Sequence, residues 1–175
     1  MTNVPILHTE RLILRGGTLA DFPSFAEMWT DPIVTRFVAG KPQTEEESWA
    51  RFLRNAGHWG LLGKGFWMLE LKDTGEMIGQ AGYVEGKRAM VPSIRGVPEI
   101  GWSLKTSAHG KGYATEAALA ALAWGEKKFG RVRNVCIIDV GNEPSMRVAE
   151  RLGFKAALDT PYHDATVRLF QRDPT

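Results

Sequence analysis

The run from His109 to Glu116 has the composition and the placement of a phosphate-binding loop. Gly110 and Gly112 come just before a long segment of helical periodicity, and glycine lets the backbone turn tightly and approach a ligand closely. The first backbone N–H groups of a helix have no partner within the helix and lie at the positive end of its dipole. A glycine-containing loop that leads into a helix therefore predicts a site for phosphate.

Spacing separates this loop from other phosphate-binding loops. The nucleotide loop G-x-x-x-x-G-K-[ST] occurs nowhere in the chain, which argues against nucleotide hydrolysis. The dinucleotide pattern G-x-G-x-x-G is met only as Gly110, Gly112 and then Thr115, with too few residues behind it for a doubly wound sheet. A dinucleotide-dependent oxidoreductase is thus the weaker alternative. The glycine-rich run 60–65 leads into a strand pattern, so we expect a connector there.

Glu99 is the candidate general base. It begins an alternating segment in which Glu99, Gly101 and Ser103 share one face, where small residues leave room for a ligand. General base catalysis needs a group that takes a proton from the reacting group. A carboxylate nearby could take that proton, directly or through water. The alternative role is a carboxylate at a strand end paired with an arginine.

Other polar groups suggest less. Asn142 is expected to be the N-cap of the helix that follows it, with Ser145 one turn into that helix. Cys136 lies in a β-branched run and is expected to be a core residue rather than a nucleophile. The 4 histidines lack the spacing of a metal site, and no G-x-S-x-G elbow of a serine hydrolase is present.

The elements that must position these residues alternate between strands and helices. Hydrophobic periodicity and turn residues predict strands over 11–15, 66–71, 77–84, 99–104, 135–138 and 166–170, and helices over 21–30, 44–56, 114–129 and 146–152. The order predicts an α/β (α+β) sandwich in which helices cover a central sheet. A chain of 175 residues with 43% apolar residues is expected to form one domain over 1–175.

Charge and cysteine content exclude several classes of protein. The 22 Lys and Arg nearly balance the 20 Asp and Glu, so no large field of one sign is available to attract nucleic acid. A single cysteine cannot form an internal disulfide, and no apolar segment typical of a signal peptide or membrane anchor precedes His8. We therefore expect a cytoplasmic protein without a membrane partner.

Four segments in this order resemble the GNAT N-acetyltransferases, in particular the branch with the ribosomal-protein alanine acetyltransferases. They are Thr9–Arg15, Glu99–Trp102, His109–Ala114 and Asn142–Phe154. The resemblance implies a mixed, mostly antiparallel sheet that splays between its fourth and fifth strands, with helices on both faces. It also implies acetyl-CoA as cosubstrate, its pantetheine arm in the gap between those strands, and no metal.

The resemblance assigns the site residues. It supports Glu99 as the catalytic base, because an amine acceptor is protonated at neutral pH and must lose a proton before it attacks the thioester. It places the cosubstrate at Trp102, Leu104, His109, Gly110, Lys111, Gly112, Tyr113, Ala114, Asn142 and Ser145. Two positions depart from the family pattern. His109 stands where Arg or Gln is common, and Ala149 stands near the usual tyrosine general acid, so Ser145 or a water must protonate the leaving thiolate.

The expected reaction follows from these assignments. An acetyl group moves from acetyl-CoA to a primary amine, of a protein N-terminus or a small molecule, by direct attack in a ternary complex. A non-catalytic acyl-CoA sensor with the same fold is the alternative. The expected partner is the amine acceptor, and a homodimer stays open.

Overall fold

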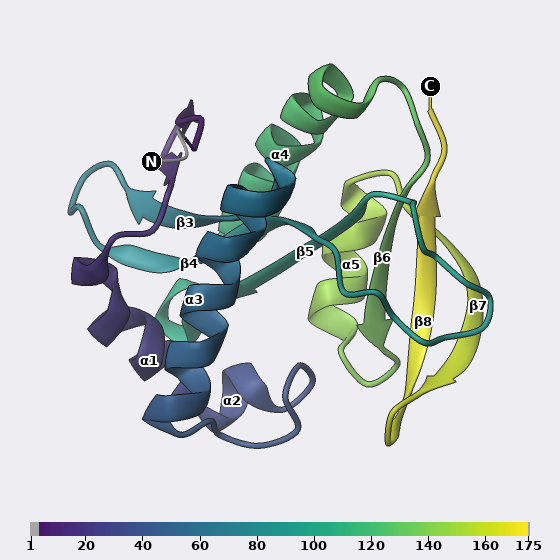
Figure 1. The fold of residues 1–175 in the computed structure, drawn as a ribbon, viewed down its shortest axis with the longest axis horizontal. Coiled ribbons are helices and arrows are strands. Elements are labelled where there is room, and N and C mark those ends of the chain that lie inside the picture. The colour runs from purple at the N-terminus through teal and green to yellow at the C-terminus, as the bar shows by residue number, and fades with distance from the viewer. Residues whose placement is uncertain (1–3, 175) are drawn as a thin grey trace.

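One mixed sheet of 8 strands runs through the molecule, in the order β1-β2-β3-β4-β5-β6-β8-β7 (Figure 1). The structure, a computed structural model, describes residues 4–174. The strands are β1 (Leu7–His8), β2 (Leu12–Arg15), β3 (Phe66–Leu71), β4 (Met77–Val84), β5 (Glu99–Leu104), β6 (Asn134–Asp139), β7 (Lys155–Tyr162) and β8 (Ala165–Arg172). The helices are α1 (Phe22–Thr30), α2 (Pro32–Thr35), α3 (Glu45–Leu62), α4 (Tyr113–Phe129) and α5 (Glu143–Arg151), with short 3₁₀ turns η1 (Leu19–Asp21) and η2 (Thr106–Ala108).

The sheet opens between β5 and β6. All other neighbouring strands pair antiparallel, whereas β5 and β6 are parallel and share the single register pair Glu99 and Val135. Beyond that pair the two strands diverge, so a gap lies between β5 and β6 where backbone hydrogen bonds would otherwise continue. The mixed, mostly antiparallel sheet with its splay between the fourth and fifth predicted strands is confirmed.

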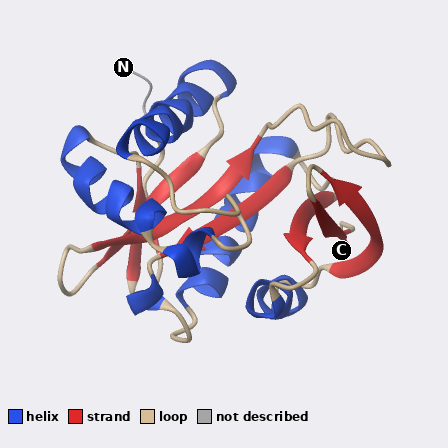
Figure 2. Cartoon of the chain, turned by 90° about the horizontal axis from the view of Figure 1, so that it is seen from below, coloured by secondary structure: helices blue, strands red, loops and turns tan. Residues whose placement is uncertain are grey.

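Helices cover both faces of the sheet, as Figure 2 shows in the view from below. The alternation along β3 explains how, since successive strand residues point to opposite faces. Trp67 and Leu69 join the larger core, to which α4 contributes Ala117 and Ala121, while Met68 joins a smaller core under α1 and α3. The expectation of helices on both faces, which the family resemblance implied, is therefore confirmed.

The helix α3 is longer than the sequence pattern indicated. It was expected to end before Gly57, but it continues to Leu62 and ends at Gly63, whose φ of 60° is left-handed. The residues Gly60–Leu62, expected to be a connector, form its last turn. The reason is tertiary: Trp59 is buried, and its Nε1 donates to the carbonyl of Phe66 at 2.9 Å, which outweighs the cost of about 1 kcal/mol for a glycine within a helix.

The sequence analysis missed the two-residue strand β1, the edge strand β7 and the short helix α2. Most of β7 is exposed, so its residues show no alternation between apolar and polar side chains. It forms only because β8 offers a pairing edge from Lys155 to Tyr162. The helix α5 also starts earlier than predicted, at Glu143, directly after its N-cap Asn142.

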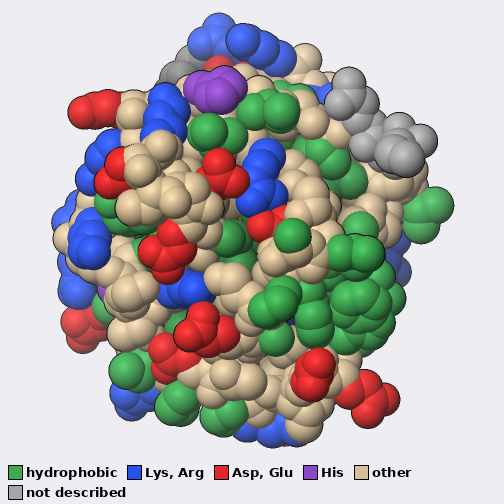
Figure 3. Space-filling view, turned by 90° about the vertical axis from the view of Figure 1, so that its left-hand side faces the viewer, with side chains coloured by type: hydrophobic (Ala, Val, Ile, Leu, Met, Phe, Trp, Pro, Cys, Tyr) green, Lys and Arg blue, Asp and Glu red, His purple; other side chains and the backbone are tan. Residues whose placement is uncertain are grey.

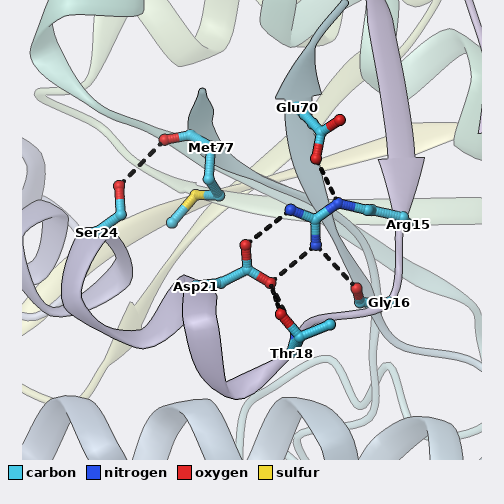
Figure 4. A network of polar contacts seen from close by, with 7 residues as sticks. All are labelled: Arg15, Gly16, Thr18, Asp21, Ser24, Glu70 and Met77. Carbon is cyan, nitrogen blue, oxygen red and sulfur yellow. Dashed lines mark hydrogen bonds and ion pairs between the residues drawn. The ribbon is translucent and has the colours of Figure 1, made fainter. Parts of the chain in front are cut away.

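A buried ion pair fixes the start of α1 against the sheet (Figure 4). The two terminal nitrogens of Arg15 donate to Asp21 at 2.8 and 2.7 Å, and its Nε donates to Glu70 on β3 at 2.6 Å. Burial by itself raises the pKa of Asp21, but hydrogen bonds from Arg15 and from the backbone of Thr18 outweigh it and hold this pKa below its usual value. The pair ties η1 and α1 to β2 and β3.

Acidic and basic side chains are interspersed on the molecular face that Figure 3 shows, the left-hand side of Figure 1. This distribution agrees with the formal net charge of +2. None of the helices within residues 4–174 has the length and apolar character that crossing a bilayer would take.

Candidate functional site

Two glycines in the left-handed region shape the loop before α4. Gly110 has a φ of 73° and Gly112, the N-cap of α4, has a φ of 82°. Because Gly112 has no side chain, no side-chain cap occupies the N–H groups of the first turn. A Cβ placed on Gly110 would meet no heavy atom within 4 Å, so the loop is open on that side. The backbone thus has the geometry that anion binding requires.

Thr115, in the first turn of α4, has a buried hydroxyl without a partner. Its Oγ1 makes no hydrogen bond within the described residues, although an unpaired buried hydroxyl is unfavourable. Thr115 lines the same cleft as Gly110 and Gly112. An unpaired donor beside free backbone amides suits a ligand with several acceptor oxygens, and the pyrophosphate of CoA is such a ligand.

Arg11, just before β2, fastens this loop to the sheet. Its Nη1 donates to the carbonyl of Lys111 at 2.9 Å, its Nε donates to Glu116 at 2.7 Å, and its guanidinium lies 4.5 Å from the ring centre of Tyr113. Burial raises the pKa of Glu116, but hydrogen bonds from Thr9 and Arg11 outweigh this and lower it overall. The loop is therefore held in place before any ligand binds.

His109 and Lys111 have different positions in this loop. His109 lines the cleft, and its Nε2 lies 2.9 Å from the carbonyl oxygen of Leu104 at the end of β5. Lys111 is exposed and does not contribute to the lining. The backbone carbonyl of Lys111 accepts the hydrogen bond from Arg11. A contact between the Lys111 side chain and the cosubstrate stays a prediction.

The loop lines a cleft of about 510 Å³, which we call the α4 cleft. This volume lies within the range of small-molecule sites. Apolar side chains from α2, among them Ile33 and Val34, also line it, which suits an extended organic arm. Of the predicted cosubstrate residues, its lining includes Trp102, Leu104, His109, Gly110, Gly112, Tyr113, Ala114, Asn142 and Ser145.

Asn142 and Ser145 are held together at the start of α5. The Oδ1 of Asn142 accepts a hydrogen bond from the backbone N–H of Ser145 at 3.3 Å, which confirms Asn142 as the N-cap. Ala149, one turn further along α5, is fully buried and has no proton to donate. Ser145 supplies the hydroxyl group that this helix start contributes to the lining of the cleft.

A second cleft of about 560 Å³ lies between α3, β5 and β6, and we call it the α3 cleft. Its lining draws on segments far apart in the sequence. Polar and ionisable side chains dominate part of it, namely Arg51, Arg54, His58, Gln80, Glu85, Arg88, Glu99, Asp139, Tyr162 and His163. A lining of this kind suits a polar ligand more than an apolar one.

The α4 cleft and the α3 cleft share part of their walls. The residues that line both are Phe37, Val38, Trp102, Ser103, Asn142 and Ser145. They lie beside the gap between β5 and β6, where the sheet has lost its ladder. A reacting group bound in one cleft can therefore meet a group bound in the other at Ser145.

Glu99 lines the α3 cleft and forms an ion pair with Arg88. Pairing with an arginine at the strand end was the alternative to a role as general base. The Nε of Arg88 lies 2.7 and 2.9 Å from the two carboxylate oxygens, its Nη2 lies 2.6 Å from Oε1, and its Nη1 donates to the hydroxyl of Tyr162. The Glu99 side chain is 7% exposed. Carboxylate oxygens have lone pairs beyond those that Arg88 uses, so the pairing leaves room for a further proton donor.

Two further expectations concern Cys136 and metal. Cys136 is buried in the larger core, where burial raises the pKa of its thiol, and this confirms it as a core residue. Within residues 4–174, no three His, Cys, Asp or Glu side chains gather as a metal site would require.

The sequence analysis missed several site residues. Arg88 lies between the predicted strands 77–84 and 99–104, where no element was expected, and Tyr162 lies on β7, which was also not expected. Arg51 and Trp29 sit on predicted helices, where polar and aromatic side chains at such spacing are commonly surface and core residues. Thr115 belonged to the quoted loop, and its helix-start position was the signal that could have singled it out.

Comparisons with known proteins identify the family of the chain. The family model for the acetyltransferase (GNAT) domain matches residues 11–155. The uncharacterized N-acetyltransferase p20 of Bacillus licheniformis is 30% identical over 165 residues, which cover 93% of this chain and 90% of that protein.

Solved structures show the same fold. A structure from Bordetella pertussis with a provisional assignment to the GNAT acetyltransferases is 34% identical, with a TM-score of 0.84 over 96% of this chain and 99% of that chain. The ribosomal L7/L12 alpha-N-protein acetyltransferase, solved with coenzyme A, has a TM-score of 0.77 over 97% and 98% of the two chains. Its 17% identity supports the fold alone.

Proposed function

Because the chain belongs to the GNAT acetyltransferase family, as the sequence resemblance indicated, we propose that it transfers an acetyl group from acetyl-CoA to a primary amine by direct attack in a ternary complex. The observation that carries this proposal is the meeting of the α4 cleft and the α3 cleft at Trp102, Ser103, Asn142 and Ser145. One cleft has the features of a phosphate site and the other has polar walls, so two substrates can be bound at once.

The α4 cleft would hold the cosubstrate. The free N–H groups at the start of α4 and the Thr115 hydroxyl would bind the pyrophosphate, with Arg11 keeping their loop in place. The edge of β5 that diverges from β6 offers backbone groups to the amide-containing arm. The thioester supplies an activated acetyl group, and this arrangement directs it toward Ser145 and the α3 cleft.

Glu99 would remove the proton that keeps the acceptor unreactive. The attacking nitrogen needs a free lone pair, and Glu99 can accept its proton directly or through a water molecule. Arg88, which also donates to the hydroxyl of Tyr162, holds the carboxylate at the cleft wall and so fixes where that proton would go. Asp139 at the end of β6 is another carboxylate in the same cleft and is the alternative acceptor of the proton.

Ser145 would return a proton to the departing thiolate. It lines both clefts, and its position at the start of α5 is fixed by Asn142. The positive end of the α5 dipole also lies at this point and favours a developing negative charge. A water molecule at the same place is the alternative donor.

An acceptor screen that measures the release of free CoA tests the proposal. The screen should include peptides with free N-termini and small-molecule amines, because the ribosomal substrate named for a structural relative makes a protein N-terminus one candidate class. Amine-dependent release of CoA with formation of the acetylated amine supports the transferase.

Two results would contradict it. CoA binding without turnover of any amine would favour the acyl-CoA sensor. A rise in Tm with NAD and none with CoA would favour the dinucleotide-dependent oxidoreductase, because a ligand stabilises the folded state that binds it.

A further inference from the structure

Arg51 of α3 is a cation in the α3 cleft that no carboxylate neutralises. Its guanidinium lies 4.0 Å from the ring centre of Trp29, and its Nε donates to the amide oxygen of Gln43 at 2.9 Å. Within the described residues, no Asp or Glu lies within ion-pair distance of Arg51, and its two terminal nitrogens make no hydrogen bond. A fixed guanidinium thus has its carboxylate-binding side unoccupied by the protein.

The surroundings of Arg51 make the lack of a carboxylate partner unfavourable in the protein without substrate. Burial, and next the charge of Arg54, lower the pKa of Arg51 to about 10, with Glu47 acting in the opposite direction. Arg51 still carries its charge at neutral pH. A partly desolvated cation beside another cation favours an anion that arrives from outside the chain.

Trp29 adds a second donor without an acceptor. Its side chain is fully buried, lines the α3 cleft and has no hydrogen-bond partner for Nε1 within the described residues. Buried indole N–H groups usually find a partner. The same part of the cleft therefore has the indole N–H of Trp29 and the terminal N–H groups of Arg51, for which residues 4–174 supply no acceptor.

The other charges in the α3 cleft are largely paired. Arg88 is bound to Glu99, and Glu85 lies 3.4 Å from Lys64 and 3.7 Å from Lys87. What is left is positive on the α3 wall, at Arg51 and Arg54. The β6 wall carries Asp139, whose Oδ1 accepts only from the backbone N–H of Gly141 in the described residues.

We propose that the amine acceptor also carries a carboxylate and that Arg51 binds it, which makes Arg51 a specificity-determining residue. This inference rests on the proposed acetyltransferase function. A guanidinium is planar and matches a carboxylate with two parallel hydrogen bonds, and its stacking on Trp29 fixes the plane in which the carboxylate must lie. The Asp139 and Glu99 side of the cleft is left for the ammonium end of the same molecule.

Matched pairs of acceptors test this proposal in the CoA-release assay. Each pair consists of an amine with a carboxylate and its neutral amide: amino acids against amino acid amides, dipeptides against their C-terminal amides, and peptides with Asp or Glu at the second position against Asn or Gln. The wild-type enzyme should prefer the carboxylate member of at least one class by about tenfold or more in kcat/KM, as a charge-assisted pair provides.

Arg51→Gln should bring the ratio of the two kcat/KM values close to one, and Arg51→Lys should restore part of it because the charge is kept and the planar fork is lost. Arg131→Gln, an exposed arginine that lines neither cleft, should leave the ratio at its wild-type value. The ratio compares two substrates of one preparation, so it is independent of the folded fraction.

Three outcomes overturn the inference. Wild-type enzyme that turns over the amides as well as the carboxylates, or better, excludes the carboxylate while the transferase function stands. An Arg51→Gln variant with the wild-type ratio excludes Arg51 as the residue that binds it. An enzyme that acetylates no amine of either kind fails the proposed function itself, and the inference with it.

Discussion

The α4 cleft and the α3 cleft share one wall but are built in different ways. The part of the α4 cleft that we propose to bind phosphate is a single stretch from His109 to Thr115, and its expected donors are mostly backbone N–H groups. The α3 cleft combines α3, the segment before β5, β6 and the end of β7, and its donors and acceptors are side chains. A cleft made from backbone keeps its ligand when neighbouring side chains change. A cleft made from side chains on distant elements changes its ligand preference when those side chains change, so we expect the choice of acceptor to depend on the α3 cleft.

Glu99→Gln should have the largest effect, and it acts on the α3 cleft alone. We expect kcat at neutral pH to fall about a hundredfold, within the range of general acid–base catalysis, with the affinity for CoA unchanged. Raising the pH should partly rescue the variant, because free amine then becomes abundant without a base. The measurement is the pH dependence of kcat with one accepted amine.

A merely structural role for Glu99 would not give that rescue. If Glu99 only neutralises Arg88, its variant should lose folding stability, and the pH profile should keep the wild-type shape. Thermal unfolding of Glu99→Gln separates loss of fold from loss of a base. A wild-type rate in the folded variant would make Asp139 or bulk water the proton acceptor.

Gly112→Val should weaken CoA binding by more than about tenfold and thus acts on the α4 cleft. Its φ of 82° is strained for a β-branched residue, and a Cβ there lies 3.4 Å from the guanidinium of Arg11. Gly130→Val is the matched control, because Gly130 has a φ of 79° at the other end of α4 and lines neither cleft. Isothermal titration with CoA measures both variants. Equal affinity of the two for CoA would remove the phosphate site from this loop.

Asp21→Asn tests how far the α3 cleft depends on distant ion pairs. Asp21 anchors the start of α1, whose last turn carries Trp29, so the variant should lose about 2 kcal/mol of unfolding free energy and bind the acceptor less well. The affinity for CoA should stay at the wild-type value. Comparable losses of acceptor affinity and of CoA affinity would show that the two clefts are not built independently.

Asp21→Asn also tests how the folding stability depends on pH. The lowered pKa of Asp21 means that its contribution to stability is fully present above the ordinary carboxyl pKa of about 3.9. That contribution is lost as the pH falls through the lower pKa of the folded state. The stability difference between wild type and Asp21→Asn should therefore be constant near neutral pH and shrink in strong acid, as chemical denaturation at several pH values can measure.

Ser145→Ala should have the smallest effect, less than about tenfold on the chemical step, because a CoA thiol is a fairly good leaving group. Ser145 lines both clefts, so this variant probes the point where they meet. A single-turnover measurement isolates the chemical step from product release. Expected is a lower rate of the chemical step. An unchanged rate would assign the proton to a water molecule.

Local patterns in the sequence were sufficient for most of the scaffold and for the backbone geometry of the loop before α4. Some features depend only on residues close together in the sequence and can be recognised there. They are the hydrophobic period of α4, the capping box of Thr44 and Glu47, and the glycines before Tyr113. The same holds for Asn142 as an N-cap. These features depend on backbone hydrogen bonding, which the neighbouring residues determine.

Only the tertiary structure decided the rest. The length of α3 depends on the burial of Trp59, and β7 exists because β8 pairs with it. The pairing of Glu99 with Arg88 and the unpaired cation of Arg51 depend on which side chains the sheet and helices bring together. No sequence period records such contacts, because they join segments tens of residues apart through side chains whose partners are set by packing.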